Sequence, residues 1–376
     1  MTEETASTKE APAARPAAPS QPTPFSYKIV GREEIGKVRW DKFAEESGTA
    51  WLYHCYDYVD IWTTFPGRSD LSFGLIDPKT SELAAIVPLY KIKDRLARFV
   101  TWNALDVFGG VALKPLTPGK IKTGIIEFLY NELQSMAVKH EAHEIRFSLA
   151  PMTPDVLGEQ CPLVNPLLDW GCHNTLGQTW VCDLRLGKEG LWKNIGKGAR
   201  SSISKAQKLG VQVRPARESD LEPYYRLHLE TFNRTGTPPM PKAFFAGIWE
   251  HFLKTGRSAI FVAELNGEVI AAANFAVYKT GVYYWTGASG AAALSSGANS
   301  SLQWTAMQWM VEQKLEWYEV GEALSKAESG KKKQISDFKK DFGGSLYPLF
   351  RGVIDTKTKF LKAMALVKEF RTQVLG

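Results

Sequence analysis

The sequence lacks any run of about 18 or more uncharged apolar residues, and its N-terminus lacks the apolar centre of a secretory signal. Its cysteines have no CxxC spacing, and none has a histidine at the offset that a zinc site needs. They are Cys55, Cys161, Cys172 and Cys182. We therefore expect reduced thiols, no metal site, no transmembrane segment and a cytoplasmic location.

No Ser-His-Asp order and no pair of active-site carboxylates stands out in the sequence either. If the protein catalyses a reaction, we expect proximity and electrostatics to dominate, with substrate or water carrying protons.

The chain is long enough for two domains, because 376 residues exceed the size at which one hydrophobic core stops growing. Residues 1–24 are rich in Ala, Pro, Ser, Thr and Glu and have almost no large apolar side chains, which predicts a disordered tail. We expect an N-terminal module over 25–180, a C-terminal module over 181–352 and a C-terminal helix over 353–376.

The charge is modestly positive, at +6 with a pI near 8.9, and it gathers in two segments, 188–208 and 326–340. An isolated run of lysines is usually a solvated face. Two such runs favour an anionic small molecule or nucleotide-linked partner, with no indication of DNA binding. The oligomeric state is not indicated.

Two segments have the same hairpin pattern. The first is Leu71 to Lys93, with a turn at Asp77-Pro78-Lys79-Thr80. The second has strands over Ala259–Leu265 and Glu268–Tyr278, joined by Asn266-Gly267, and a third strand over Val282–Thr286. Because each return strand begins with Glu followed by an Ala- and Ile-rich run, we interpret them as parts of a duplicated α/β module.

Amphipathic helices are expected around these strands. The predicted ranges are Lys120–His140, Ser219–Asn233 with Ser219 as its cap, Pro241–Lys254, Ser300–Gln313, and one or two helices between Leu191 and Leu209. A short strand over Leu346–Val353 and a basic helix over Thr356–Leu375 follow.

Three elements could carry chemistry. In the first, Arg200 and Lys205 lie with Lys197, Ser201 and Lys208 within a few helical turns, an arrangement suited to phosphate. The second is the strand Tyr283 to Gly290 with the loop up to Asn299, the position where acetyltransferase folds bind the diphosphate of coenzyme A. This loop has a glycine, Gly297, but no arginine, which argues against routine use of acetyl-coenzyme A.

The third element is Phe338-Lys339-Lys340-Asp341-Phe342-Gly343-Gly344. It holds a lysine between aromatic residues, where a cation could stabilise negative charge that develops on an oxygen. The alternative interpretation is a surface helix with packed phenylalanines.

Taken in order, these motifs resemble the FemAB family, the Fem-type peptidyltransferases, over roughly residues 26–350. The residues that carry the resemblance are Trp51-Leu52-Tyr53-His54-Cys55-Tyr56 with Trp62, Phe108-Gly109-Gly110, Arg200 to Val211, Tyr283 to Ser289, Asn299 to Trp304, and Phe338 to Gly344. The resemblance implies two tandem modules of the acetyltransferase-like GNAT fold, each a mixed, mostly antiparallel sheet flanked by helices.

The resemblance also implies a transferase that moves an acyl or aminoacyl group to an amine of a cell-envelope, peptidoglycan or polysaccharide precursor. The donor would be aminoacyl-tRNA or acyl-coenzyme A, with tRNA as a further candidate partner and no permanently bound cofactor. Lys339 would be catalytic, and the expected substrate-binding residues are Arg200, Lys205, Arg234, Tyr284, Trp285, Asn299, Gln303 and Phe338.

The sequence departs from the family in two places. The family's Asp-hydrophobic-Gly-Gly strand end is here Glu319-Val320-Gly321-Glu322, and the coiled-coil arm of some members is absent. The missing arm favours a first alternative, an acyl-thioester-dependent N-acyltransferase that acts on an amino sugar. A second alternative is a non-catalytic module that binds an anionic glycan or nucleotide.

Overall fold

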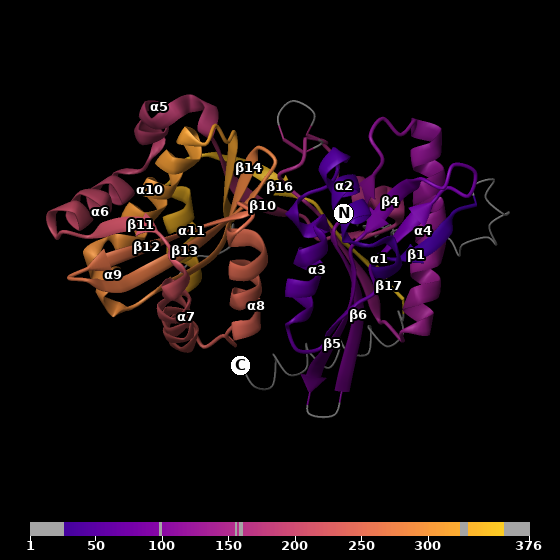
Figure 1. Ribbon diagram of the computed structural model, residues 1–376, viewed down its shortest axis with the longest axis horizontal. Helices are drawn as coiled ribbons and strands as arrows, with labels where there is room; N and C mark the ends of the chain where they lie inside the picture. The colour runs from indigo at the N-terminus through magenta and orange to yellow at the C-terminus, as the bar shows by residue number, and fades with distance from the viewer. Residues whose placement is uncertain (1–25, 98–99, 155, 158–160, 324–329, 357–376) are drawn as a thin grey trace, which may run out of the picture.

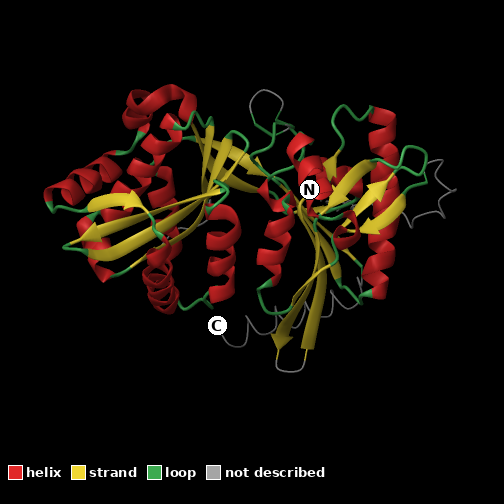
Figure 2. Cartoon of the chain, viewed as in Figure 1, coloured by secondary structure: helices red, strands yellow, loops and turns green. Residues whose placement is uncertain are grey.

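The computed structural model describes residues 26–97, 100–154, 156–157, 161–323 and 330–356, in two halves that lie side by side (Figure 1). In each half, helices flank a mainly antiparallel sheet (Figure 2), which confirms the predicted α/β class. The predicted disordered tail and nearly all of the predicted C-terminal helix lie outside the described residues.

The C-terminal half contains a seven-stranded sheet. Its strands, in sheet order, are β11 (Gln212–Pro215), β12 (Ser258–Leu265), β13 (Glu268–Tyr278), β14 (Gly281–Ser289), β15 (Trp317–Glu322), β10 (Gly177–Asp183) and β16 (Ser345–Leu349). All neighbours are antiparallel except β14 and β15, which are parallel.

The N-terminal half has a four-stranded and a six-stranded sheet. The first is ordered β1 (Lys28–Gly31), β3 (Phe73–Ile76), β4 (Leu83–Val87) and β7 (Ala112–Leu113); the second is β2 (Arg68–Asp70), β5 (Leu89–Ala97), β6 (Val100–Gly109), β8 (Glu144–Leu149), β17 (Arg351–Asp355) and β9 (His173–Asn174). Pro88 separates β4 from β5, and a proline is suited to this position because it has no N–H to donate to a ladder.

The two halves exchange strands. β10 inserts into the C-terminal sheet between β15 and β16, while β17 returns to the N-terminal half and pairs with β8. In the C-terminal half, the parallel strands β14 and β15 are followed in the sheet by the antiparallel β10. In the N-terminal half, the parallel strands β6 and β8 are followed by the antiparallel β17. The repeated order supports the duplicated module that the hairpin pattern predicts.

Helices cover both faces of the C-terminal sheet. α7 (Leu221–Thr235) and α8 (Lys242–Gly247) pack on the face toward the N-terminal half, whereas α5 (Gly187–Asn194), α6 (Lys197–Lys208), α9 (Ala291–Ser296), α10 (Ala298–Glu312) and α11 (Gly330–Lys340) pack on the other. The N-terminal half has α1 (Arg32–Ile35), α2 (Lys37–Glu46), α3 (Tyr56–Thr63) and α4 (Gly119–Lys139).

Most predicted local elements are present. Asn266 and Gly267 both have positive φ, as a two-residue hairpin turn requires, and Leu265 pairs with Glu268. β3 and β4 pair antiparallel across the predicted Asp77 turn. The region 187–208 forms two helices, α5 and α6.

Two predicted details are wrong. Ser219 does not cap α7, because a 3-10 turn over Glu218–Asp220 precedes the helix and the Asp220 carboxylate accepts a hydrogen bond from the Arg217 N–H. The single strand predicted over Leu346–Val353 is two strands, β16 and β17, in different sheets. The predicted boundary between the modules, at residue 180, falls inside β10. The other predicted domain boundaries stay predictions.

The halves are joined by an aromatic cluster and by polar contacts. Tyr58 of α3 stacks on Trp285 of β14, with ring centroids 5.6 Å apart, and both rings contact Phe252. The Lys279 ammonium donates to the backbone oxygens of Ser47 and Ala50, at 2.5 and 3.4 Å. The relative position of the two halves is therefore fixed by packing as well as by the exchanged strands.

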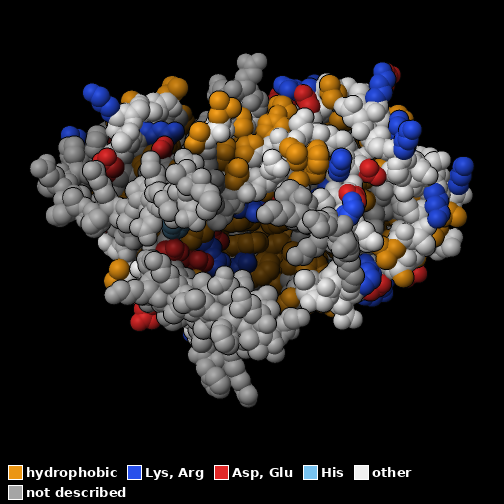
Figure 3. Space-filling model, turned by 180° about the vertical axis from the view of Figure 1, so that it is seen from behind, with side chains coloured by type: hydrophobic (Ala, Val, Ile, Leu, Met, Phe, Trp, Pro, Cys, Tyr) orange, Lys and Arg blue, Asp and Glu red, His pale blue; other side chains and the backbone are white. Residues whose placement is uncertain are grey.

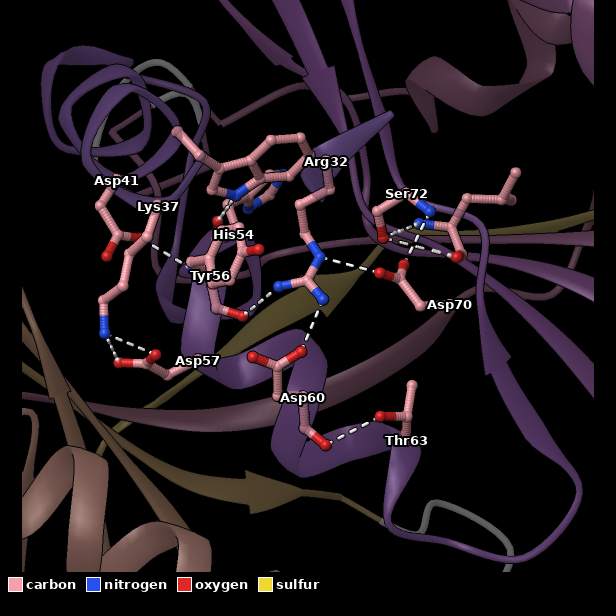
Figure 4. A network of polar contacts seen from close by, with 12 residues as sticks. Arg32, Lys37, Asp41, His54, Tyr56, Asp57, Asp60, Thr63, Asp70 and Ser72 are labelled. Carbon is pink, nitrogen blue, oxygen red and sulfur yellow. Dashed lines mark hydrogen bonds and ion pairs between the residues drawn. The ribbon is translucent and has the colours of Figure 1, made fainter. Parts of the chain in front are cut away.

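A network of hydrogen bonds around Arg32 holds the first turns of α3 in place (Figure 4). The guanidinium, which is 4% exposed, donates to Asp60 at 2.5 Å, to Asp70 at 2.8 Å and to the Tyr56 backbone oxygen at 3.1 Å. It also lies 3.9 Å from the centre of the Tyr56 ring. Because α3 carries the aromatic residues of the interface, this network positions the contact between the halves.

Replacing Arg32 tests this role. We expect Arg32→Met to lower the free energy of unfolding by about 2–4 kcal/mol, because it leaves the Asp70 carboxylate without its partner. Chemical denaturation measures the change. Lys28→Met is the control, because Lys28 and Glu34 lie 3.8 Å apart with both side chains 68% exposed, and such pairs contribute less than about 1 kcal/mol. Equal losses in the two variants would contradict the assignment.

Candidate active site between two separating strands

The parallel strands β14 and β15 pair over only three positions. Their register runs from Gly281 and Trp317 to Tyr283 and Glu319, and then β14 continues to Ser289 without pairing to β15. The corresponding strands of the N-terminal half, β6 and β8, remain paired to the end at Gly109 and Leu149. Among the described parallel pairs, the C-terminal one therefore leaves an opening in its backbone hydrogen-bond ladder beyond Tyr283 and Glu319.

A side chain from α10 bridges the two strands where they separate. The buried Gln303 accepts a hydrogen bond from the Tyr318 hydroxyl of β15 and also hydrogen-bonds Tyr284 of β14. The Tyr284 hydroxyl lies over Gly287, where a Cβ atom would be only 1.8 Å from it. Gln303 and Tyr284 thus lie on the face of the sheet that α10 covers, and their contact with substrate stays a prediction.

Glu319 is a buried carboxylic acid beside this opening. Its side chain is 3% exposed, Oε1 accepts a hydrogen bond from the Thr179 hydroxyl at 2.9 Å, and Oε2 has no partner among the described residues. Burial raises the pKa of Glu319 to about 7, although the Thr179 hydrogen bond and the charges of Lys339 and Arg351 oppose the rise. Such a group is half ionised near neutral pH, as a general base should be.

Lys339, at the end of α11, reaches the same strand. Its ammonium donates to the Glu322 backbone oxygen at 3.3 Å and would lie 2.8 Å from a Cβ at Gly321. Gly321 has φ +114°, a conformation that side chains rarely adopt, so glycine is needed here for both conformation and space. Burial lowers the pKa of Lys339, whereas Glu319 and Glu322 counteract this effect.

Residues of the exchanged strand and of the N-terminal half complete the surroundings. Arg351 of β17 donates to the Glu322 carboxylate at 3.0 Å. Burial is the main cause of the raised pKa of Tyr53, and Tyr283 and Glu319 raise it further. Figure 3 shows a hollow between the two halves, on the rear face, that carries hydrophobic side chains beside acidic and basic ones.

The structure places some predicted site residues near this opening. Phe338 precedes Lys339 and packs edge-on against Phe342, with centroids 5.0 Å apart, which anchors α11 in the core. Trp285 lies on the other face of β14, in the aromatic cluster between the halves.

The residue that follows the second basic segment, Asp341, contacts the first basic segment. The Gly196 N–H, just before α6, donates to the Asp341 backbone oxygen at 2.7 Å, and the Asp341 carboxylate lies against Gly196 and Gly198. Arg200, in the first turn of α6, is half-buried, whereas Lys205 lies five residues farther along and is exposed. The segments therefore converge at the start of α6, with Lys205 farther away.

Two predicted residues lie at the far end of β14. Arg234 donates to the Ser289 backbone oxygen at 3.1 Å, six residues beyond the last position paired with β15, which is about 20 Å along a strand. Asn299 is half-buried in the first turn of α10, next to Gly297, which packs on the backbone of Ser202. The structure does not bring Arg234 to Lys339.

The sequence analysis gave no role to Glu319, Thr179 or Arg351, and it noted Glu319 only as a departure from the family motif. The motif was a usable signal, because it ends a strand with glycine beside acidic residues. Within the described residues no group of His, Cys, Asp and Glu is arranged to hold a metal ion. In the same part of the chain, no helix combines the length and apolarity needed to cross a membrane.

Comparisons with known proteins agree with this fold. Residues 194–339 match the family model of the acetyltransferase (GNAT) domain. No curated protein sequence matches the chain. The solved structure of FemX is 13% identical, with a TM-score of 0.68 over 89% of this chain and 99% of its own.

Two other solved structures are similar in fold. L-PGS from Bacillus licheniformis is 14% identical, with a TM-score of 0.53 over 88% of this chain and 96% of its own. A tandem GNAT protein from the clavulanic acid biosynthesis pathway is 11% identical, with a TM-score of 0.51 over 88% and 99%. Residues 194–339 thus match the GNAT acetyltransferase domain model, and the whole chain has the FemAB-like tandem GNAT fold that its motifs predict.

Proposed function

We propose that the protein is an N-acyltransferase that moves an acyl or aminoacyl group to an amine of a cell-envelope or polysaccharide precursor. The observation that supports this most is the buried carboxyl of Glu319, with one oxygen unpartnered, beside the opening between β14 and β15. The GNAT domain match and the likeness to FemX support the same reaction class. A cytoplasmic location stays part of the proposal.

Glu319 would act as the general base. An amine attacks an acyl carbon only when it is neutral, and its ammonium form must first lose a proton. The unpartnered Oε2 can accept that proton. Glu319 passes this first proton to water and is a base again. As the C–N bond forms, the nitrogen loses a second proton to Glu319; the bond from the acyl carbon to the donor's oxygen or sulfur breaks, and this second proton passes to that leaving atom.

Lys339 would stabilise the oxyanion of the tetrahedral intermediate. Its ammonium is partly buried and held at Gly321 by the Glu322 backbone oxygen, so it is in place before the reaction begins. A cation in a partly desolvated site stabilises developing negative charge more strongly than one in water.

The turn after β14 favours an aminoacyl donor over coenzyme A. The Glu230 carboxylate accepts a hydrogen bond from the Ala291 N–H at 3.2 Å, and it also lies near Arg234, at 3.7 Å. A carboxylate at this turn repels the diphosphate that many GNAT proteins bind there. Acyl-coenzyme A remains the second candidate donor, because the family model that matches residues 194–339 is an acetyltransferase model.

Lys339→Met tests the role of the lysine. We expect turnover to fall by about 10²-fold or more, because the oxyanion loses its charged donor. The unfolding midpoint should stay close to that of the wild type. Lys340→Met is the matched control, since Lys340 is the next residue and is exposed. Product formation is followed by mass spectrometry, and unchanged turnover in Lys339→Met would remove the residue from the mechanism.

The pH dependence tests the role of Glu319. Its base form increases as the pH rises through about 7, so kcat/KM should rise over the same range and then level off. Glu319→Gln should abolish this rise and lower kcat strongly. Lys339→Met should move the rise to higher pH, because Lys339 lowers the pKa of Glu319. A pH profile that is the same in all three proteins would contradict a base at this position.

Calorimetric titration with acetyl-coenzyme A separates the two donors. We expect no saturable binding to the wild-type protein, because Glu230 occupies the turn after β14. Transfer from aminoacyl-tRNA to a peptide or amino-sugar amine should then give product. Tight binding of acetyl-coenzyme A and acetyl transfer would establish the second donor, and absence of product with every donor would favour a purely binding role.

A further inference from the structure

The six-stranded sheet of the N-terminal half has a polar face that the proposed reaction does not use. On β6 and β8, alternate side chains pack against α4 in the core, among them Leu105, Val107, Ile145 and Phe147. Because side chains alternate along a strand, the residues between them face away from α4. This opposite face is rich in charged and polar residues.

The strand registers align these residues in rows. Tyr90 of β5 pairs with Asp106 of β6, and Asp106 pairs with Arg146 of β8. Residues at paired positions lie on the same face, so the three side chains are direct neighbours. Arg68 of β2 pairs with Ile92, two residues from Tyr90, and thus lies on this face as well.

Several atoms of this group have no partner. Tyr90 is fully buried, yet its hydroxyl makes no hydrogen bond, and the same holds for Nη1 of Arg68. The half-buried Asp106 has neither a hydrogen bond nor an ion pair within the described residues. Because buried polar groups are nearly always paired, the two unpaired atoms beside the half-buried Asp106 carboxylate indicate a place for a ligand.

The electrostatics of the group agree with this geometry. Burial raises the pKa of Asp106 to about 6, and the charges of Arg146 and Arg68 only partly offset it. Burial also lowers the pKa of Arg68, whose guanidinium stacks 3.9 Å above the Trp62 ring and so keeps a fixed position. Arg68 and Asp106 thus keep unused hydrogen-bonding capacity, whereas Arg146 donates to the Glu144 carboxylate at 2.5 Å.

The mixture of groups selects the ligand. A phosphate would be repelled by the Asp106 carboxylate, and a metal ion or simple ammonium would be repelled by Arg68 and Arg146. An apolar ligand would leave the Tyr90 hydroxyl, Nη1 of Arg68 and the Asp106 carboxylate without a hydrogen bond. Hydroxyl groups suit the site, because each can donate to a carboxylate while it accepts from a guanidinium or a phenol.

We propose that Arg68, Tyr90, Asp106 and Arg146 form a subsite for a hydroxyl-rich, saccharide portion of the acceptor. This inference rests on the proposed function and assigns the acceptor to amino sugars in oligosaccharide form.

The subsite leads toward Glu319. Arg351 of β17 pairs with Ser148 of β8, which pairs with Phe108 of β6, two residues from Asp106. Two strand spacings across the sheet and two residues along β6 give a separation of about 12 Å between Arg351 and Asp106. Arg351 in turn contacts Glu322, which follows Glu319 on β15. A single sugar ring does not span this distance, so the acceptor binds with a distal ring at Asp106 and its reacting amine at Glu319.

Equilibrium binding without any donor tests the subsite directly. The probe is the glucosamine disaccharide, titrated into the full-length protein by calorimetry. We expect Asp106→Asn and Tyr90→Phe each to weaken binding by about tenfold, the loss expected for hydrogen bonds that involve charged or buried groups. Glu127→Gln, on the exposed surface of α4, is the control and should bind like the wild type.

Thermal stability separates binding from a structural role. Because Asp106 has no partner in the described protein, Asp106→Asn should unfold at the same temperature as the wild type or higher. A lower unfolding temperature would show that the carboxylate holds the fold together and would overturn the proposal. Unchanged disaccharide binding in Asp106→Asn, or displacement of the disaccharide by inorganic phosphate, would also overturn it.

A second variant keeps this test distinct from the test of the reaction. Glu319→Gln should lose acyl transfer, while its binding of the disaccharide should keep the same dependence on Asp106. If the disaccharide binds through Asp106 but no donor ever gives product, the subsite stands and the proposed function fails. If transfer to a small amine occurs and the disaccharide does not bind, the subsite fails and the proposed function stands.

Discussion

The burial of Glu319 is the constraint on which the rest of the site depends. Its carboxyl is removed from water by both halves of the molecule, yet only one of its oxygens has a hydrogen-bond partner among the described residues. That partner, Thr179, comes from β10, and the nearby Arg351 comes from β17. The two exchanged strands therefore do more than join the halves, because they supply the groups that set the environment of this carboxyl.

The two halves differ in how far their parallel strands stay paired. In the C-terminal half, β14 and β15 separate after Tyr283 and leave an opening beside Glu319 and Lys339. In the N-terminal half, β6 and β8 stay paired, and their outer face carries Asp106 and Arg146 instead. We infer that one module supplies the reaction and the other holds the acceptor, which is consistent with a hollow between them (Figure 3).

Local signals in the sequence predict most of the fold. Asn266-Gly267 specifies its hairpin because both residues adopt positive φ, and the pattern over 120–140 specifies α4. The strand exchange could not be predicted, because nothing local shows that the chain changes sheets at Phe350. Ser219 failed as a cap because Asp220 forms an alternative turn, held by hydrogen bonds from Arg214 of the preceding strand. Glu319 and its partner Thr179 are 140 residues apart, so their meeting depends on the fold as a whole.

The most direct test of this account is the pKa of Glu319 in the free protein. Carboxyl carbon chemical shifts, followed by NMR through a pH titration of the wild type and of Glu319→Gln, identify the resonance that belongs to this residue. The account predicts that it titrates at about 7. A midpoint in the ordinary range of an exposed glutamate would contradict a desolvated carboxyl and the base assigned to it.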